Sequence, residues 1–152
     1  MQRRHLLQGA AGALPLAALG LAGLPRPVRA AWPERAFHDQ DLAAVEADLF
    51  GDRTPQDSDA VVITAPEIAE NGRVVPVEVT IDLPAPRTLT LLSDANPYPL
   101  LARAHFTPAV EPRVSLRVKL GESANLIALV EADDGLYRAA RAVKVTAGGC
   151  GG

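Results

Sequence analysis

The sequence predicts an all-β protein: an immunoglobulin-like antiparallel β-sandwich with a short N-terminal helix and a flexible, Gly-rich C-terminal arm. Two observations predict the sandwich. Apolar and polar residues alternate with a period of two in successive short segments after residue 60, and turn-forming residues rather than helices separate these segments. The 152 residues contain a single cysteine, so the domain lacks the paired cysteines of antibody domains.

Residues 1–30 are predicted to be a cleaved twin-arginine signal peptide. Arg3 and Arg4 precede an apolar stretch, and Val28 and Ala30 fit a small-residue cleavage site. The apolar stretch is shorter than the about 20 residues that cross a bilayer, which disfavours the alternative of an uncleaved membrane anchor. Cleavage removes four arginines and no acids, so the formal net charge of −3 falls by four, to −7. A chain this acidic is a poor partner for nucleic acid, and export places it in an oxidising compartment.

Residues 31–60 are predicted to form a helix and a loop. Pro33 can open the helix, Asp39 and Asp41 suit a helix start, and Gly51 suits a helix end. Apolar residues recur between them at helical spacing, at Phe37, Leu42, Val45 and Leu49. The polar stretch 52–59 is interpreted as loop.

Residues 61–146 are predicted to be the β-sandwich domain. The strand pattern occurs at 61–64, 75–83, 87–92, 114–120, 124–131 and 137–145. Pro76 cannot donate to a β-ladder, which predicts an edge position at its end of that strand. The segment 124–131 is more apolar and is expected to be more central. Turns are predicted at Asn71-Gly72, 121–123 and 133–135.

The sequence contains no recognisable metal or cofactor site. His5 lies in the signal peptide, and His38 and His105 are far apart in sequence and are interpreted as surface or loop residues. There is no C-x-x-C-H motif for covalent haem, no phosphate-binding loop, no dinucleotide motif and no G-x-S-x-G motif. We therefore expect no cofactor and no metal, and we disfavour an autonomous enzyme.

The loop 96–99, with the sequence Asn-Pro-Tyr-Pro, is stiff because its two prolines fix the backbone. It is interpreted as an ordinary end loop of the sandwich, and the alternative is a contact for a partner. Trp32, Tyr98 and Phe106 belong to a small set of aromatic residues. Each fits a core or interface anchor better than a residue that stacks on a ligand.

The candidate site residue is Cys150, the point of covalent attachment, on an arm formed by residues 147–152. Its neighbours are all glycines, which give the arm flexibility: Gly148, Gly149, Gly151 and Gly152. A lone cysteine cannot cross-link its own fold, and only two residues follow it, which excludes a prenylation motif. An ordinary thiol is about 3% thiolate at pH 7. From Thr146 to Cys150 the arm spans roughly 13–14 Å when fully extended, which suits delivery of a thiol into another protein's active site.

Several sequence blocks occur together in this chain: VKVTAGGCGG at 143–152, APEIAENG at 65–72, VVPV at 74–77 and Asn96-Pro97. With the twin-arginine signal, they resemble the SoxY family, the sulfur-carrier subunits of the thiosulfate-oxidising Sox system. One departure is Ala147, where the family commonly has Ile or a similar residue, and this difference does not affect the thiol.

The resemblance implies a periplasmic carrier with an immunoglobulin-like fold that forms a heterodimer with SoxZ. It implies that the terminal cysteine, here Cys150, is loaded oxidatively with thiosulfate by the c-type cytochrome complex SoxXA. The dimanganese enzyme SoxB then hydrolyses the sulfone sulfur to sulfate, and the sulfane sulfur is oxidised by SoxCD or passed elsewhere. The carrier itself holds no metal or haem.

Two other hypotheses come from different functional classes. In the first, the chain is a β-sandwich binding or assembly module that uses Cys150 for an intermolecular disulfide. In the second, it is an autonomous thiol-dependent oxidoreductase. The absence of a resolving cysteine and of a positioned base disfavours the second hypothesis.

Overall fold

The computed structural model describes residues 33–146. The predicted signal peptide, Trp32 and the predicted arm at 147–152 lie outside these residues. In chain order the elements are α2 (Glu34–His38), α3 (Leu42–Phe50), β1 (Gln56–Asp57), β2 (Val61–Thr64), β3 (Ile68–Ala69), β4 (Val75–Ile81), β5 (Pro86–Ser93), β6 (Leu100–His105), β7 (Arg113–Val118), β8 (Ala124–Ala132) and β9 (Leu136–Val145). Within the described range, no helix has the length and apolar character needed to cross a membrane.

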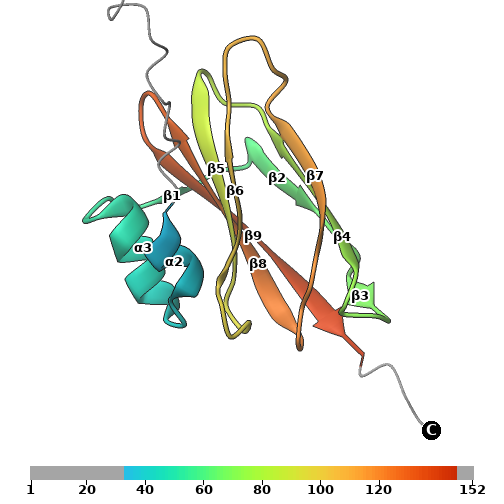
Figure 1. The fold of residues 1–152 in the computed structure, drawn as a ribbon. Helices are drawn as coiled ribbons and strands as arrows, with labels where there is room; N and C mark the ends of the chain where they lie inside the picture. Colours follow the sequence, from blue (N-terminus) through green and yellow to red (C-terminus); the bar gives the residue numbers. More distant parts are fainter. Residues whose placement is uncertain (1–32, 147–152) are drawn as a thin grey trace, which may run out of the picture. The chain divides into compact units, whose positions relative to one another are not determined.

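The strands form two sheets, which we call the large sheet and the small sheet (Figure 1). The large sheet has the order β1-β9-β8-β5-β6, with β3 also paired to β9, and the small sheet has the order β2-β4-β7. β1 and β3 run parallel to β9, and the other neighbouring strands are antiparallel. The predicted all-β, immunoglobulin-like sandwich is confirmed.

β1, β2 and β3 together behave as one edge strand that changes sheets. β1 pairs with the start of β9, β2 pairs with β4 in the small sheet, and β3 returns to pair with the end of β9. β1 and β3 are not predicted from the sequence, because two residues are too few to show an alternating pattern. β1 lies in the stretch 52–59, which was predicted to be loop.

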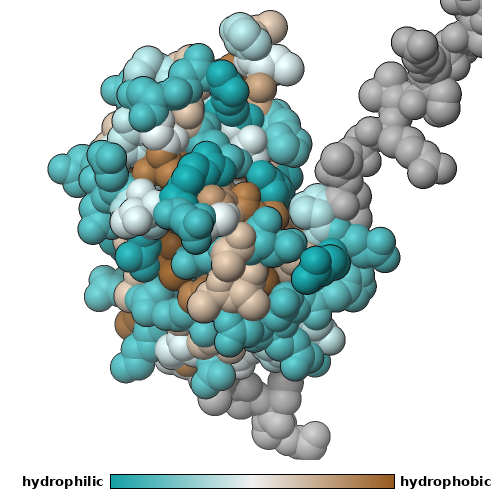
Figure 2. Space-filling model, turned by 90° about the vertical axis from the view of Figure 1, so that its left-hand side faces the viewer, coloured by the Kyte–Doolittle hydropathy of each residue, from teal (hydrophilic) through white to brown (hydrophobic). Residues whose placement is uncertain are grey.

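Two apolar cores lie on opposite faces of the large sheet. One fills the space between the sheets and includes Val79 and Leu91. The other lies between the helices and the outer face of the large sheet, and it includes Val45, Leu92 and Leu129. From the helix side the surface is mainly hydrophilic, with apolar side chains gathered in a central area (Figure 2). The helices therefore form a third layer that covers the large sheet.

The predicted single helix is in fact two, α2 and α3. The Asp41 carboxylate caps α3 by accepting a hydrogen bond from the Ala44 N–H at 2.8 Å, and Gly51 ends α3 with a φ of 62°. Asp39 lies at the end of α2, not at a helix start, and its side chain accepts a hydrogen bond from the Asp41 N–H. Short polar side chains that bind nearby backbone in this way interrupt a helix.

The strand predictions are confirmed for the six alternating segments, and β6 is an additional strand. β6 lacks alternation because most of its residues are half-buried at the edge of the large sheet. Pro76 pairs with Arg117 of β7, whereas β2 reaches β4 only between Glu78 and Ile81, so Pro76 has a partner strand on one side. The predicted edge position is therefore confirmed, as is the central position of β8 between β9 and β5.

Candidate functional site

The predicted site residues Cys150, Gly148, Gly149, Gly151 and Gly152 lie outside the described residues. The structure does describe the point from which the chain continues toward them. We call this region the arm root and define it as the end of β9 (144–146) with the two segments bonded to it or packed on it, 67–74 and 120–123. It lies where β9, β3 and β4 meet (Figure 1).

β3 fixes the end of β9 from one side. The Lys144 N–H donates to the Glu67 carbonyl at 2.9 Å, and the Thr146 N–H donates to the Ala69 carbonyl at 3.1 Å. Ile68 and Ala69 are in parallel register with Lys144 and Val145. The backbone is therefore held in the sheet as far as the last described residue, Thr146.

Ser123 fixes the end of β9 from the other side. The Val145 N–H donates to the Ser123 hydroxyl at 3.0 Å, and that hydroxyl donates to the Val145 carbonyl at 3.4 Å. Ser123 directly precedes β8. Its side chain therefore extends the hydrogen bonding between β8 and β9 beyond the last paired residues, Ala124 and Val143. Both polar backbone groups of Val145 are satisfied by one hydroxyl.

Gly72 packs the turn after β3 directly onto the other segments of the arm root. A Cβ atom at this position would lie 2.3 Å from the Leu120 carbonyl oxygen and 2.9 Å from Cγ1 of Val145. The Leu120 N–H donates to the Gly72 carbonyl at 2.7 Å. The predicted Asn71-Gly72 turn therefore requires glycine for close packing.

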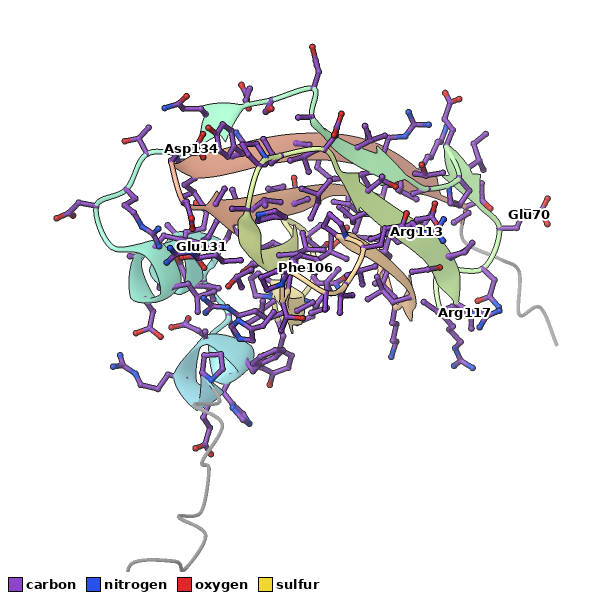
Figure 3. The ribbon with its side chains drawn as sticks, turned by 90° about the horizontal axis from the view of Figure 1, so that it is seen from above. Glu70, Phe106, Arg113, Arg117, Glu131 and Asp134 are labelled. Carbon is purple, nitrogen blue, oxygen red and sulfur yellow. The ribbon has the colours of Figure 1, made fainter. Side chains whose placement is uncertain are left out.

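The arm root carries exposed side chains of both charge signs: Glu67, Glu70, Arg73, Glu122 and Lys144. Two large apolar side chains are exposed among them, Ile68 at 55% and Val74 at 51%. Glu70 lies at the opposite end of the molecule from Asp134, at the β8–β9 turn (Figure 3). The arm root is thus a surface with exposed apolar side chains, and β9, about 30 Å long, separates it from the other end of the sandwich.

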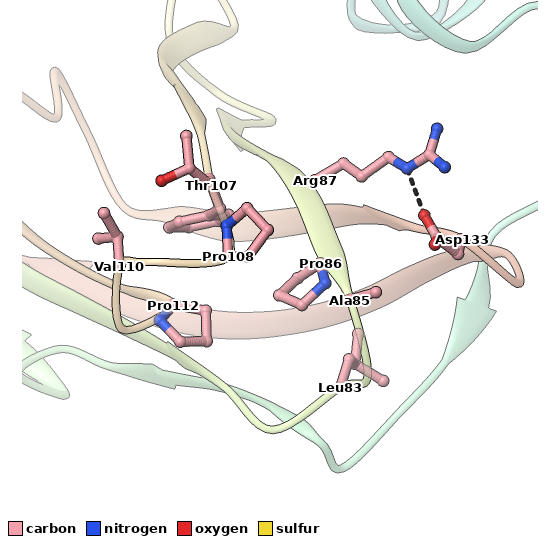
Figure 4. Close-up of a pocket in the computed structure, with 10 residues that line it drawn as sticks. Leu83, Ala85, Pro86, Arg87, Thr107, Pro108, Val110, Pro112 and Asp133 are labelled. Carbon is pink, nitrogen blue, oxygen red and sulfur yellow. Dashed lines mark hydrogen bonds and ion pairs between the residues drawn. The ribbon is translucent and has the colours of Figure 1, made fainter.

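The other end of the sandwich has a pocket of about 610 Å³, shown in Figure 4. Apolar side chains and prolines line much of it, and Arg87 and Asp133 form an ion pair at its rim. Val110 lines this pocket and is 57% exposed. Because the pocket lies beside the start of β9, it is remote from the arm root.

Titratable groups interact on the large sheet and at its β8–β9 turn. The Glu131 carboxylate bonds Arg53 at 2.5 Å and Arg103 at 3.0 Å, which links the chain after α3 to β8 and β6. A hydrogen bond to Asp134, together with burial and the Asp134 charge, raises the pKa of Tyr137 above its ordinary value. Sequence reasoning missed the Glu131 cluster, since its members lie in three separate segments.

The two histidines in the described range are exposed and separate. His38 Nδ1 lies 2.8 Å from the Glu34 carbonyl oxygen in α2, and His105 Nδ1 lies 3.1 Å from Oγ1 of Thr88 at the end of β6. Their predicted surface location is confirmed. Among residues 33–146, no three His, Cys, Asp or Glu side chains gather into a group that could hold a metal ion.

Residues 46–150 match the sequence model of a family described as Sulfur oxidation protein SoxY. The solved structure of the sulfur carrier protein SoxY from Chlorobium limicola f thiosulfatophilum is similar, with 42% sequence identity and a TM-score of 0.64. That similarity covers 69% of this chain and 96% of the other.

A superoxide reductase (neelaredoxin) from Ignicoccus hospitalis also has a similar structure. Its sequence identity is 26% and its TM-score 0.52, over 57% of this chain and 80% of the other. The comparison with curated proteins gives no match. The sequence match and the higher structural similarity thus point to the same family of proteins.

Proposed function

This chain belongs to the SoxY family of sulfur oxidation proteins, and from that premise we propose that it is a periplasmic carrier that holds sulfur covalently on Cys150. SoxY is a sulfur carrier protein and not an enzyme. The observation that carries the proposal for Cys150 is the family match over residues 46–150, which ends at the single cysteine of the chain.

The proposed chemistry follows from a thiol and from the Sox enzymes that the resemblance implies. In loading, Sγ of Cys150 forms a bond to the outer sulfur of thiosulfate, one proton leaves, and SoxXA accepts two electrons. In hydrolysis, SoxB directs water to the sulfone sulfur of the Cys–S–S–SO₃⁻ adduct, which releases sulfate and a proton and leaves a persulfide. The persulfide sulfur is then oxidised by SoxCD or passed to another acceptor.

The arm root supports this role mechanically. The backbone is hydrogen-bonded through Thr146, so the reach of the thiol is set by the four residues that follow. These residues span roughly 13–14 Å when extended. A folded domain is too wide for an enzyme channel, but a glycine-flanked cysteine is narrow enough to enter one.

We also propose that the carrier forms a heterodimer with SoxZ in the periplasm. The twin-arginine motif at Arg3-Arg4 supports export. β6 and β7 each pair on one side within the sheets described, so each has an edge that a second β-protein can approach.

The test is a mass measurement of the chain isolated from the periplasm of thiosulfate-grown cells under non-reducing conditions. We expect wild-type protein to carry thiosulfonate and persulfide adducts that a reductant removes. Cys150→Ser should carry neither, because no other thiol is present. Adducts that persist on Cys150→Ser would contradict the proposal.

The alternative assembly role gives a different result in the same samples. An intermolecular disulfide at Cys150 predicts a covalent dimer on a non-reducing gel that thiosulfate does not exchange. A monomeric band with adducts supports the carrier, and a stable dimer without adducts supports the assembly module.

A further inference from the structure

We propose that the arm end of the sandwich is the surface on which enzymes dock when they act on Cys150. We define the arm end as the arm root together with the loop 94–99. The proposal rests on the proposed carrier function and adds to it a location and a partner chemistry. The occupant is the mouth of an enzyme's active-site channel, with apolar side chains at its lip and charges of both signs around them.

The length of the arm requires contact close to Thr146. Cys150 lies four residues beyond Thr146, so their Cα atoms are at most about 13–14 Å apart, and the average separation in a Gly-rich chain of this length is about 10–12 Å. Catalytic groups lie inside clefts that bury most of a ligand. If the reacting group lies about 10 Å inside a channel, only a few ångström remain between the channel mouth and Thr146. The mouth must then touch the arm root.

The side chains of β3 are arranged in a way that burial alone does not explain. Ala69 faces the core and is 6% exposed, whereas the larger Ile68 points outward and is 55% exposed. Val74, in the turn that follows, is also half exposed. An exposed Ile68 side chain contributes no burial free energy to the isolated chain. A partner that covers Ile68 would gain that free energy on binding.

The loop 94–99 adds an aromatic side chain to the same end. The Asn96 side chain donates to the Lys119 carbonyl at 2.8 Å and accepts from the Gly121 N–H at 3.2 Å, which fastens the loop to the arm root. Tyr98 is 51% exposed and lines a pocket of about 560 Å³ with Leu101 and other residues. Exposed aromatic and branched side chains with a charged rim are typical of interface anchors.

The charges at the arm end do not favour a partner of one sign. The acidic side chains exposed there are Glu67, Glu70, Asp94 and Glu122, and the basic ones are Arg73 and Lys144. A partner surface with both acidic and basic side chains, each paired with an opposite charge at the arm end, therefore fits better than a uniformly basic or acidic partner surface. Apolar contact at Ile68 is the main expected source of affinity, and the rim sets orientation.

The experiment measures sulfate release by purified SoxB from the full chain, isolated with any subunit that copurifies. Tetrathionate loads every variant identically: the Cys150 thiolate attacks an inner sulfur, Cys–S–S–SO₃⁻ forms, and thiosulfate leaves. We expect Ile68→Asp to lower kcat/KM by about tenfold or more, because burial of a large apolar side chain is lost at the contact. Its rate of loading by tetrathionate should equal that of wild type, since a small reagent needs no docking.

Val110→Asp is the matched control, because Val110 is equally exposed but lies at the opposite end of the sandwich. We expect this variant to keep the wild-type kcat/KM. Ile68→Ser, with a melting temperature measured for each variant, separates a docking defect from a folding defect. Equal kcat/KM for Ile68→Asp and wild type, or equal losses for Ile68→Asp and Val110→Asp, would overturn the docking surface while leaving the carrier function intact.

Two further outcomes also decide the matter. If Ile68→Asp loses a copurifying subunit, a permanent partner occupies this surface and the inference is wrong. If SoxB releases no sulfate from loaded wild-type chain and Cys150 carries no adduct in cells, the proposed function fails and the inference fails with it.

Discussion

The large sheet and the small sheet differ in how many of their faces are covered. In the large sheet β8 is buried from Leu126 to Val130 without a break, because helices pack on one face and the small sheet on the other. In the small sheet, β4 alternates between buried and less buried residues along its whole length. Alternation therefore reports burial on one face, and its loss in β8 marks an additional layer of structure.

The largest expected difference between the sheets comes from truncating one side chain on the outer face of each. Leu129→Ala removes a buried contact between β8 and the helical layer and should lower the free energy of unfolding by about 2–5 kcal/mol. Thr80→Ala, on the exposed face of the small sheet, should change it by no more than about 0.5 kcal/mol. Chemical denaturation of the mature chain measures both. Equal effects would mean that the helices do not stabilise the large sheet.

A smaller difference is expected for the two acidic side chains that pair with arginine. Glu131 on β8 is 16% exposed and bonds two arginines, so Glu131→Ala should cost about 1.5–3 kcal/mol. Glu78 on β4 is more exposed and lies 4.0 Å from Arg113, so Glu78→Ala should cost about 0–1 kcal/mol. Denaturation at low and high salt checks this comparison. If the Glu78 variant lost more stability than the Glu131 variant, burial would not be what strengthens the Glu131 cluster.

The smallest expected change in stability comes from removing the N-terminal cap of α3 in the helical layer. Asp41→Ala removes the side-chain acceptor for the Ala44 N–H and should destabilise the chain by about 1 kcal/mol. Asp41→Asn keeps an acceptor oxygen and serves as the control. Amide hydrogen exchange should speed up in α3 more than in the small sheet. Uniform acceleration across both would show that the helices unfold together with the whole sandwich.

Local sequence patterns predicted the elements whose cause is local. The Asp41 cap and the Gly51 end of α3 were predicted because capping depends on a few adjacent residues. β4 was predicted from its alternation, and Pro76 was placed correctly because proline lacks a backbone donor. The split at Asp39 was missed, since Asp39 accepts a hydrogen bond from the nearby Asp41 N–H instead of capping a helix start.

Long-range features of the arm root were not predictable in the same way. Ser123 bonds Val145, and Gly72 packs on Leu120, only because distant segments meet at the end of β9. The turn at Asn71-Gly72 was predicted, but the packing that requires glycine was not. β3 is too short to show any pattern, although Glu67, just before it, and Ala69 within it accept the two hydrogen bonds that fix the end of β9.

The amino-acid sequence alone was enough to predict the class of the fold, the edge position of Pro76 and a single cysteine four residues beyond Thr146, because composition and two-residue periodicity are local properties of the chain. The tertiary structure decided the third layer of helices, the strand that changes sheets and the surface around the arm root. These features depend on contacts between segments far apart in sequence. The free energy of strand pairing and side-chain packing determines them, and local propensity does not. Ile68 illustrates the division: β3 is too short to show a pattern in the sequence, and the packing of Ala69 on the core leaves Ile68 exposed beside Thr146.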